Sequence, residues 1–352
     1  MATLSMQYRP RTTRSLAIAT GKRETSSALS SPVAIERLRM APDRFHEPAL
    51  AREIVDLFSG LPRGVVVDAT LGGAGHALAI LESAPQLRVL GIDRDPDARA
   101  EASSRLAPYG ERALVVSATF ADIDDVLQRE SAFLDADPVV GVLMDLGVSS
   151  HQLDDPRRGF SFRVDAPLDM RMDPTTGESA ADFISRVDVH DLARLLRHHG
   201  EGRFAGGIAK SIVERQPRTT LELSEAVERA VPMAARRRGH VATRVFQALR
   251  VEVNAEEDQL ELGLRGALDA LGVGGLLAVI SYHSGEDRVV KAFLADQQSG
   301  GCTCPPDLPC VCGAVPRVQV FKNSAQLASA DEIARNPRAR SARLRIARKV
   351  AP

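Results

Sequence analysis

The chain has no tryptophan, few aromatic residues and only four cysteines among its 352 residues. Aromatic residues make up 4% of the chain and apolar residues 44%, so Leu, Val, Ile and Ala must supply most of the core volume. No apolar run reaches the roughly 18 residues that a membrane-spanning helix needs. We therefore expect a globular protein of the cytoplasm, with a sizeable core and no membrane partner.

The chain also lacks an excess of either charge. Its 45 Lys and Arg residues are balanced by 46 Asp and Glu residues, which gives a formal net charge of −1. This balance argues against a basic surface over the whole chain, but a local cluster of cations is enough to bind nucleic acid. Two such clusters stand out, at residues 236–240 and 335–343. Each is either a phosphate contact or simply a solvated surface.

The first 43 residues differ from the rest of the chain. They are rich in Ser, Thr, Ala and Arg, and Glu24 and Glu36 are the only acids among the first 40. We expect residues 1–43 to form a disordered N-terminal extension. An over-extended gene start, with Met40 as the true initiator, and a mitochondrial transit peptide are the alternatives.

Residues 65–76 have the pattern of a buried strand, a tight glycine loop and the start of a helix. Glycine has no Cβ, so a ligand can approach the backbone of this loop closely. No Gly-Lys-Ser/Thr sequence follows, which excludes a P-loop. Leu78 occupies the position of the third glycine in the dinucleotide motif, which disfavours pyrophosphate and therefore a nicotinamide oxidoreductase.

A second apolar strand, residues 87–92, ends at Asp93. A carboxylate at the tip of this strand has two acceptor oxygens and is well placed to accept both hydroxyls of a ribose. A glycine loop without phosphate-binding residues, followed by such an acid, favours S-adenosylmethionine as the cofactor. The alternative is a plain strand–helix–strand crossover whose glycines only make the turn.

Strands alternate with helices through residues 49–145 and again after residue 254. We expect one strand that begins at residue 65 and further strands at 87–92, 113–116, 139–144 and 276–280. We expect helices at 49–58, 95–106, 122–127, 257–271 and 289–294. A closing antiparallel pair of strands is expected at 318–321 and 344–347. This alternation predicts a parallel, doubly wound α/β sheet that binds ligands at the carboxyl ends of its strands. Asp68, Asp93 and Asp145 fall at three of these ends.

Residues 146–174 have no clear period, although their interleaved Phe, Met and Leu residues argue for an ordered segment. Helical spacing then dominates residues 178–251. We expect an all-helical domain, residues 154–250, inserted into an α/β domain made of residues 44–153 plus 251–352.

The four cysteines lie together, as Cys302, Cys304, Cys310 and Cys312. Their spacing differs from the usual pairs of zinc ligands, Cys-x-x-Cys. A tetrahedral thiolate site, a flexible reduced loop and a disulfide all remain open, so the sequence assigns no metal.

Several segments together resemble the family of bacterial ribosomal RNA small-subunit methyltransferase H, also called MraW. The segments that carry the resemblance are residues 68–76, 92–96, 146–154, 158–174, 243–250, 281–288 and 336–341, and the match extends over about 44–350. The strings Asp-Leu-Gly-Val-Ser-Ser and Pro-Leu-Asp-Met-Arg-Met are far more specific than a glycine loop. Tyr282 is a departure, because many members have Phe there.

The resemblance implies a class I, Rossmann-like methyltransferase sheet and N4-methylation of a cytosine in the decoding centre of 16S ribosomal RNA, within the small ribosomal subunit. It implies S-adenosyl-L-methionine as donor, Asp93 on the ribose and Phe120 on the adenine. The cofactor-binding residues that it implies are Ala74, Gly75, His76, Asp93, Phe120, Asp145 and Gln152.

The amine of cytosine is a weak nucleophile, so the enzyme must position it and accept a proton or polarise it. Asp145 is our candidate acceptor, although it could serve the cofactor alone, and His283 is the second choice. Access to the base requires an unpaired or flipped nucleotide. A catalytically idle RNA-binding or assembly factor on the same fold is the alternative function. The sequence leaves open whether the protein is a monomer or a homodimer.

Overall fold

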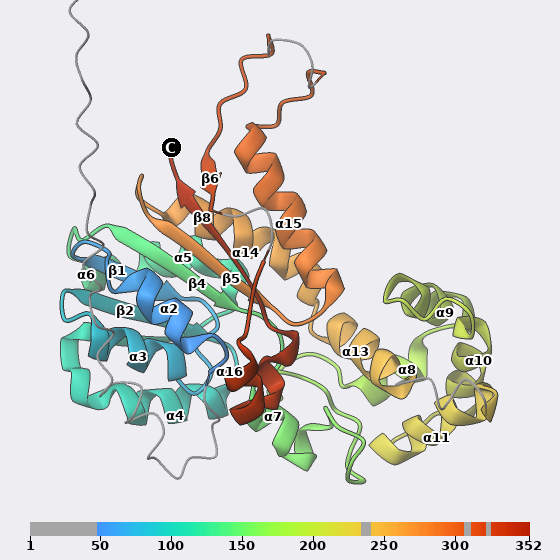
Figure 1. The fold of residues 1–352 in the computed structure, drawn as a ribbon. Coiled ribbons are helices and arrows are strands. Elements are labelled where there is room, and N and C mark those ends of the chain that lie inside the picture. Colours follow the sequence, from blue (N-terminus) through green and yellow to red (C-terminus); the bar gives the residue numbers. More distant parts are fainter. Residues whose placement is uncertain (1–47, 234–240, 306–310, 322–324) are drawn as a thin grey trace, which may run out of the picture.

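The computed structural model describes residues 48–233, 241–305, 311–321 and 325–352, and Figure 1 shows the fold. The predicted extension at residues 1–43 and the arginine cluster at 236–240 lie outside the described residues. Among the helices that are described, none combines the length and the apolar character needed to cross a membrane.

One sheet organises the α/β part of the molecule. Its strands are β1 (Gly64–Asp68), β2 (Leu87–Asp93), β3 (Ala113–Ser117), β4 (Val139–Asp145), β5 (Leu276–Ser281), β6 (Val318–Val320), β7 (Gln326–Leu327) and β8 (Arg343–Lys349). Their order is β3-β2-β1-β4-β5-β8-β6, and β7 also pairs with β8. The first five strands are mutually parallel, whereas β8 runs antiparallel to β5, β6 and β7. The predicted fold class is confirmed.

The order of the strands creates a switch point between β1 and β4. The chain moves outward from β1 through β2 to β3 and then returns to the other side of β1 as β4. Connections on the two sides of such a point diverge and leave a crevice at the carboxyl ends of the strands. The register places Asp68 beside Leu143 and Asp145 beside Ile280, so these strand ends lie at one edge of the sheet.

Helices cover both faces of the sheet, because β1 and β4 are apolar up to the aspartate at the end of each strand and would otherwise expose these residues to water. One face packs against α2 (Ala51–Phe58), α3 (Gly75–Ser83) and α4 (Pro96–Leu106), and the other against α5 (Ile123–Arg129), α14 (Glu256–Ala270) and α15 (Ser284–Ser299). A helix on each face shields the apolar strands from water, and the two cores on either side of the sheet include Ile80 and Leu264 respectively.

A third hydrophobic core lies among helices beside the sheet (Figure 1). It is built from α8 (Ala180–Arg186), α9 (Val189–His198), α10 (Ala205–Arg215), α11 (Thr220–Ala230) and α13 (Val241–Val253). Phe160, Leu168, Met170 and Met172 from the predicted aperiodic segment are buried in the same core. The interleaved apolar residues therefore do order that segment, as expected.

Most predicted elements agree with the structure, and two of the differences lie beside the functional site described below. The segment after β4 contains a short helix, α7 (Ser150–Asp154), where the sequence shows no period. Ser149 starts this helix by accepting a hydrogen bond from the backbone of Gln152. Helix α15 begins at Ser284 and not at residue 289, because the ring of His283 caps its first turn.

The C-terminal part of the chain returns to the same end of the sheet. Helix α16 (Ala330–Arg335) and a 3₁₀ turn, Pro337–Ser341, precede β8 and lie beside α7 (Figure 1). An ion pair of 2.6 Å between Arg338 and Asp154 joins the two segments.

Candidate active site

A cavity of about 700 Å³ lies at the carboxyl ends of β1, β2 and β4. Six of the seven predicted cofactor-binding residues line it: Gly75, His76, Asp93, Phe120, Asp145 and Gln152. Ala74 is fully buried and does not line the cavity; it is the N-terminal cap of α3. The helical core closes the cavity on another side with Phe160, Phe162 and Phe246.

The glycine loop exposes its backbone to the cavity at one position. Gly72 has a φ of 50°, in the left-handed region that favours glycine, and a Cβ built there would meet nothing within 4 Å. A Cβ on Gly75 would lie 3.0 Å from the ring of Pro48. The loop thus exposes its backbone to the cavity at Gly72 while packing closely behind Gly75.

Asp93 ties the glycine loop to the end of β2. One carboxylate oxygen accepts a hydrogen bond from the backbone N–H of Gly72 at 2.7 Å, and the other accepts one from Asp95 at 2.8 Å. Burial raises the pKa of this carboxyl, and the two backbone donors partly offset that effect. Each carboxylate oxygen has a further lone pair and can accept another hydrogen bond.

Phe120 lies in a 3₁₀ turn after β3 and packs against α14. A Cβ on Gly263 of α14 would lie 2.5 Å from Cδ2 of Phe120 and 3.2 Å from Cε of Met144. Only glycine lets the helix and this ring approach so closely. The sequence analysis missed Gly263, and the signal that could have identified it is a glycine inside an amphipathic helix.

Asp145 is held from three directions. Its backbone N–H donates to the hydroxyl of Thr70 at 2.6 Å, and the hydroxyl of Tyr282 donates to its Oδ1 at 2.9 Å. Nε2 of His76 lies 3.5 Å from its Oδ2. Burial raises the pKa of Tyr282 well above its ordinary value, and the charge of Asp145 raises it further, so the phenol remains a hydrogen-bond donor.

Asp68 lies beneath the cavity and does not line it. Burial raises its pKa from 3.8 to about 7; His76 opposes this shift, whereas Asp145 and Asp93 add to it. Its Oδ1 accepts a long hydrogen bond, 3.4 Å, from the backbone of Thr70, while its Oδ2 has no partner among the described residues. This carboxyl can therefore exchange a proton near neutral pH.

Both polar atoms of the Gln152 side chain are hydrogen-bonded within the protein. Its amide nitrogen donates to Oδ2 of Asp95 at 2.7 Å, and its amide oxygen accepts from the backbone of Ser149 at 2.9 Å. Asp95 also forms an ion pair with Arg158 at 2.9 Å, in which both side chains are buried.

The buried Asp95–Arg158 pair is a structural feature that the sequence analysis missed. Arg158 donates to the carbonyl of Met172 at 2.7 Å, and the side chain of Asn254 accepts from the backbone N–H of Met172 at 2.7 Å. These bonds fasten the segment after α7 to the start of α4 and to the residue after α13. No local sequence signal could have found them, because the partners are 63 and 82 residues apart.

His283, the second candidate for the proton acceptor, has the geometry of a helix cap. Its Nδ1 accepts from the backbone N–H groups of Gly285 and Glu286 at 3.1 and 3.3 Å. Its Nε2 lies 2.8 Å from Glu286. The ring lines the cavity, but these contacts give it a structural role at the start of α15.

The C-terminal arginine cluster has members of two kinds. Arg338 pairs with Asp154, and Arg343 lies 3.7 Å from Asp287. Arg335 and Arg340 are exposed and form no ion pair with any residue that the structure describes. Arg338 and Ser341 line the cavity, so these free cations lie next to its rim.

Comparisons with known proteins identify a family that this chain matches over most of its length. The pattern that defines the MraW methylase family matches residues 43–350. The ribosomal RNA small subunit methyltransferase H of Carboxydothermus hydrogenoformans is 48% identical over 310 residues, or 87% of this chain and 98% of that protein. The protein of the same name from Geobacter sulfurreducens is 47% identical over 312 residues, or 87% and 99%.

Solved structures show a more distant likeness. An rRNA methylase from Streptococcus thermophilus aligns over 86% of this chain and 95% of its own, with 13% identity and a TM-score of 0.35.

Proposed function

The chain belongs to the MraW methylase family and is an S-adenosylmethionine-dependent methyltransferase, and from this premise we propose that it methylates 16S ribosomal RNA in the small ribosomal subunit. We further propose that the target is the exocyclic N4 of a cytosine in the decoding centre. Because ribosomal subunits are its substrate, we place the protein in the cytoplasm.

One observation carries the proposal. A bare glycine loop, a strand-end carboxylate and an aromatic ring, Phe120, converge on one cavity at the switch point of the sheet. Open-sheet proteins bind their ligands at this place. These residues suit a nucleoside that carries a cationic sulfonium. Asp93 and Asp145 supply acceptor oxygens, and Gly72 leaves its backbone uncovered.

We assign the cofactor contacts residue by residue. Asp93 accepts the ribose hydroxyls with its remaining lone pairs, and Phe120 packs on the face of the adenine. The loop at Gly75 and His76 admits the methionine part, with Ala74 fixing the turn from behind. Gln152 completes the wall, held in place by Asp95.

S-adenosylmethionine supplies an electrophilic methyl group, so transfer forms a bond from N4 to carbon, leaves the broken bond's electron pair on sulfur and releases one proton from N4. Asp145 is the proposed proton acceptor, because Tyr282 holds its carboxylate and Thr70 holds its backbone at the edge of the cavity. The same carboxylate can polarise the amine before transfer. Positioning of this kind can lower a barrier by about 7–11 kcal/mol in favourable cases.

We assign substrate recognition to the helical part of the chain. In this division residues 44–153 plus 251–352 form the methyltransferase domain and residues 154–250 the inserted domain that contacts RNA. Phe162 and Phe246 support this assignment: they line the cavity with ring centroids 5.0 Å apart, where an unpaired base could stack.

The test is incubation of the protein with labelled S-adenosylmethionine and unmodified small subunits, followed by mapping of the labelled nucleotide. We expect one labelled cytosine with the methyl on N4. Asp93→Ala should weaken binding of S-adenosylmethionine, and Asp145→Ala should abolish transfer in a protein that still folds.

Three outcomes would contradict the proposal. Label on another nucleotide would refute the target, and full activity of Asp145→Ala would remove Asp145 from the mechanism. Subunit binding without any methyl transfer would favour the idle RNA-binding factor.

A further inference from the structure

The three described cysteines lie in a segment that takes no part in the cavity. Residues 300–317 connect α15 to β6, and their described parts project beyond the sheet in Figure 1. None of these residues lines the cavity. The methyltransferase chemistry therefore gives no reason for three thiols to gather there.

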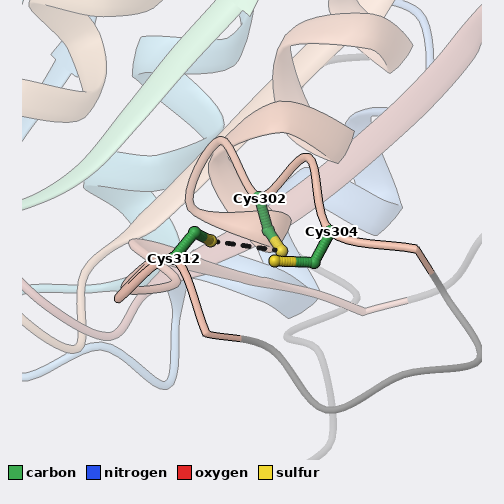
Figure 2. Close-up of side chains that lie close together, drawn as sticks. All are labelled: Cys302, Cys304 and Cys312. Atoms are coloured by element: carbon green, nitrogen blue, oxygen red, sulfur yellow. Dashed lines mark hydrogen bonds between the residues drawn. The ribbon is translucent and has the colours of Figure 1, made fainter.

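The three sulfur atoms nevertheless lie close together. The Sγ atoms of Cys302, Cys304 and Cys312 all lie within 4.8 Å of one another. Figure 2 shows the side chains turned toward a common centre from the two limbs of the segment, residues 300–305 and 311–317. Cys302 and Cys304 are partly buried, and Cys312 is exposed.

The spacing of the sulfur atoms matches metal ligands and not a disulfide. Sγ of Cys302 and Sγ of Cys312 are 3.5 Å apart. A disulfide bond would require about 2.05 Å. Thiolates at about 2.3 Å from a tetrahedral zinc ion lie about 3.8 Å from one another, close to the observed distance.

In the part of this segment that the structure describes, no hydrophobic core explains the convergence of the thiols. The two described valines face solvent: Val311 is 89% exposed and Val315 is 63% exposed. The limbs do approach at their base, where Gly300 packs so closely on the backbone of Val315 that a Cβ would clash. Small units without a core commonly rely on a bound metal for their structure.

Hydrogen bonds converge on one of the three sulfur atoms. The backbone N–H of Val311 donates to the sulfur of Cys304, and Cys312 contributes further hydrogen bonds. Sulfur ligands suit soft metal ions such as zinc.

We propose that Cys302, Cys304 and Cys312 bind a zinc ion that holds the two limbs of residues 300–317 together. The site is structural, because it lies apart from the cavity. Cys310 lies outside the described residues and is not part of the proposed site.

The test is zinc content of the full-length protein, purified under reducing conditions without chelator and dialysed against metal-free buffer. Elemental analysis should give about one zinc per chain. The zinc content should fall at least tenfold in each of three variants, Cys302→Ser, Cys304→Ser and Cys312→Ser. Thr303→Ala, an exposed position between two ligands, is the control and should retain the metal. Cobalt(II) in place of zinc should show thiolate-to-metal charge transfer and the intense absorption of tetrahedral coordination.

Three results would overturn the proposal. They are folded protein that retains no zinc, zinc content unchanged in the three serine variants, and a Cys302–Cys312 disulfide found by mass spectrometry in protein prepared with zinc. These measurements need neither RNA nor S-adenosylmethionine, so the outcome is independent of the proposed methyl transfer.

Discussion

Gly263 sets how closely α14 can approach Phe120. The space that a Cβ would occupy is already taken by the Phe120 ring on one side and by Met144 on another. Any side chain here must displace the ring from the place that we assign to the adenine. Gly263, which does not line the cavity, thus controls the position of Phe120, which does.

We predict that Gly263→Ala weakens binding of S-adenosylmethionine about tenfold, or about 1.4 kcal/mol, because Phe120 must move. Overpacking should also reduce stability by about 1–3 kcal/mol. Calorimetric titration and denaturant unfolding measure the two effects. The control is Gly266→Ala on the same helix, whose Cβ would have only ordinary contacts, the nearest at 3.6 Å. Wild-type affinity in Gly263→Ala would show that the ring does not matter.

Asp68 couples stability to pH. Its pKa of about 7 in the folded protein is above its ordinary value of 3.8, so the folded state binds this proton more tightly than the unfolded state does. The associated stability is fully present below about pH 4 and is lost as the pH rises through 7. The titratable groups that act on Asp68 are His76, Asp145 and Asp93.

Asp68→Asn should therefore become more stable relative to the wild type as the pH rises from 5 to 8. Raising the pKa of Asp68 from 3.8 to about 7 corresponds to at most about 4 kcal/mol in the free energy of unfolding at pH 8. Unfolding by urea at several pH values measures the difference. Asp56→Asn, an exposed carboxylate on α2, should show no such trend. A constant difference between Asp68→Asn and the wild type would mean that Asp68 does not titrate in this range.

At the scale of elements, the buried Asp95–Arg158 pair joins three parts of the chain. Asp95 caps α4 by accepting from the backbone of Asp97 at 3.0 Å, and it also holds Gln152 of α7. Arg158 fastens the following segment through Met172. Side-chain exposures of 1% for Asp95 and 7% for Arg158 leave water little access to the pair.

Arg158→Met should destabilise the protein by about 3–5 kcal/mol, because it leaves the carboxylate of Asp95 buried without its partner. Chemical unfolding measures this loss. Arg157→Met is the matched control: the side chain of Arg157 is 85% exposed, and its pair with Asp155 is screened by water, so the change should be small. Replacing both Asp95 and Arg158 by apolar residues should recover part of the loss. Equal effects at Arg157 and Arg158 would contradict the argument.

The element boundaries show how far local patterns reach. Apolar runs predicted the five parallel strands closely, because buried β-strands leave a clear signal in the sequence. The start of α15 was wrong by five residues, since a histidine cap is not a common N-terminal signal. Helix α7 was missed because five residues are too few to show a helical period.

At the scale of the molecule, the cavity has walls from both the sheet and the helical core. Asp93 and Asp145 come from the sheet, whereas Phe160 and Phe246 come from the helical core. The exposed Arg335 and Arg340 add positive charge near the rim, although the chain as a whole is close to neutral. A near-neutral protein can still present a local cationic surface to RNA.

Replacing Arg335 and Arg340 together by Gln should weaken binding to small subunits and reduce its dependence on salt, because each phosphate contact contributes about 0.7–0.9 to the slope of log K against log salt. Filter binding at several salt concentrations measures both effects. Affinity for S-adenosylmethionine should not change. Lys210→Gln on α10, which lies outside the cavity lining, is the control. An unchanged salt slope in the double variant would exclude these arginines from the RNA interface.

The sequence by itself determined the succession of strands and helices along the chain, the glycine loop and the acids at the strand ends. Each of these depends on a pattern among a few neighbouring residues. Only the tertiary structure decided that Gly263 makes room for Phe120, that Tyr282 holds Asp145, and that Arg158 reaches Asp95. Those contacts join residues 63 or more positions apart: they depend on how the elements pack, and no local pattern encodes that.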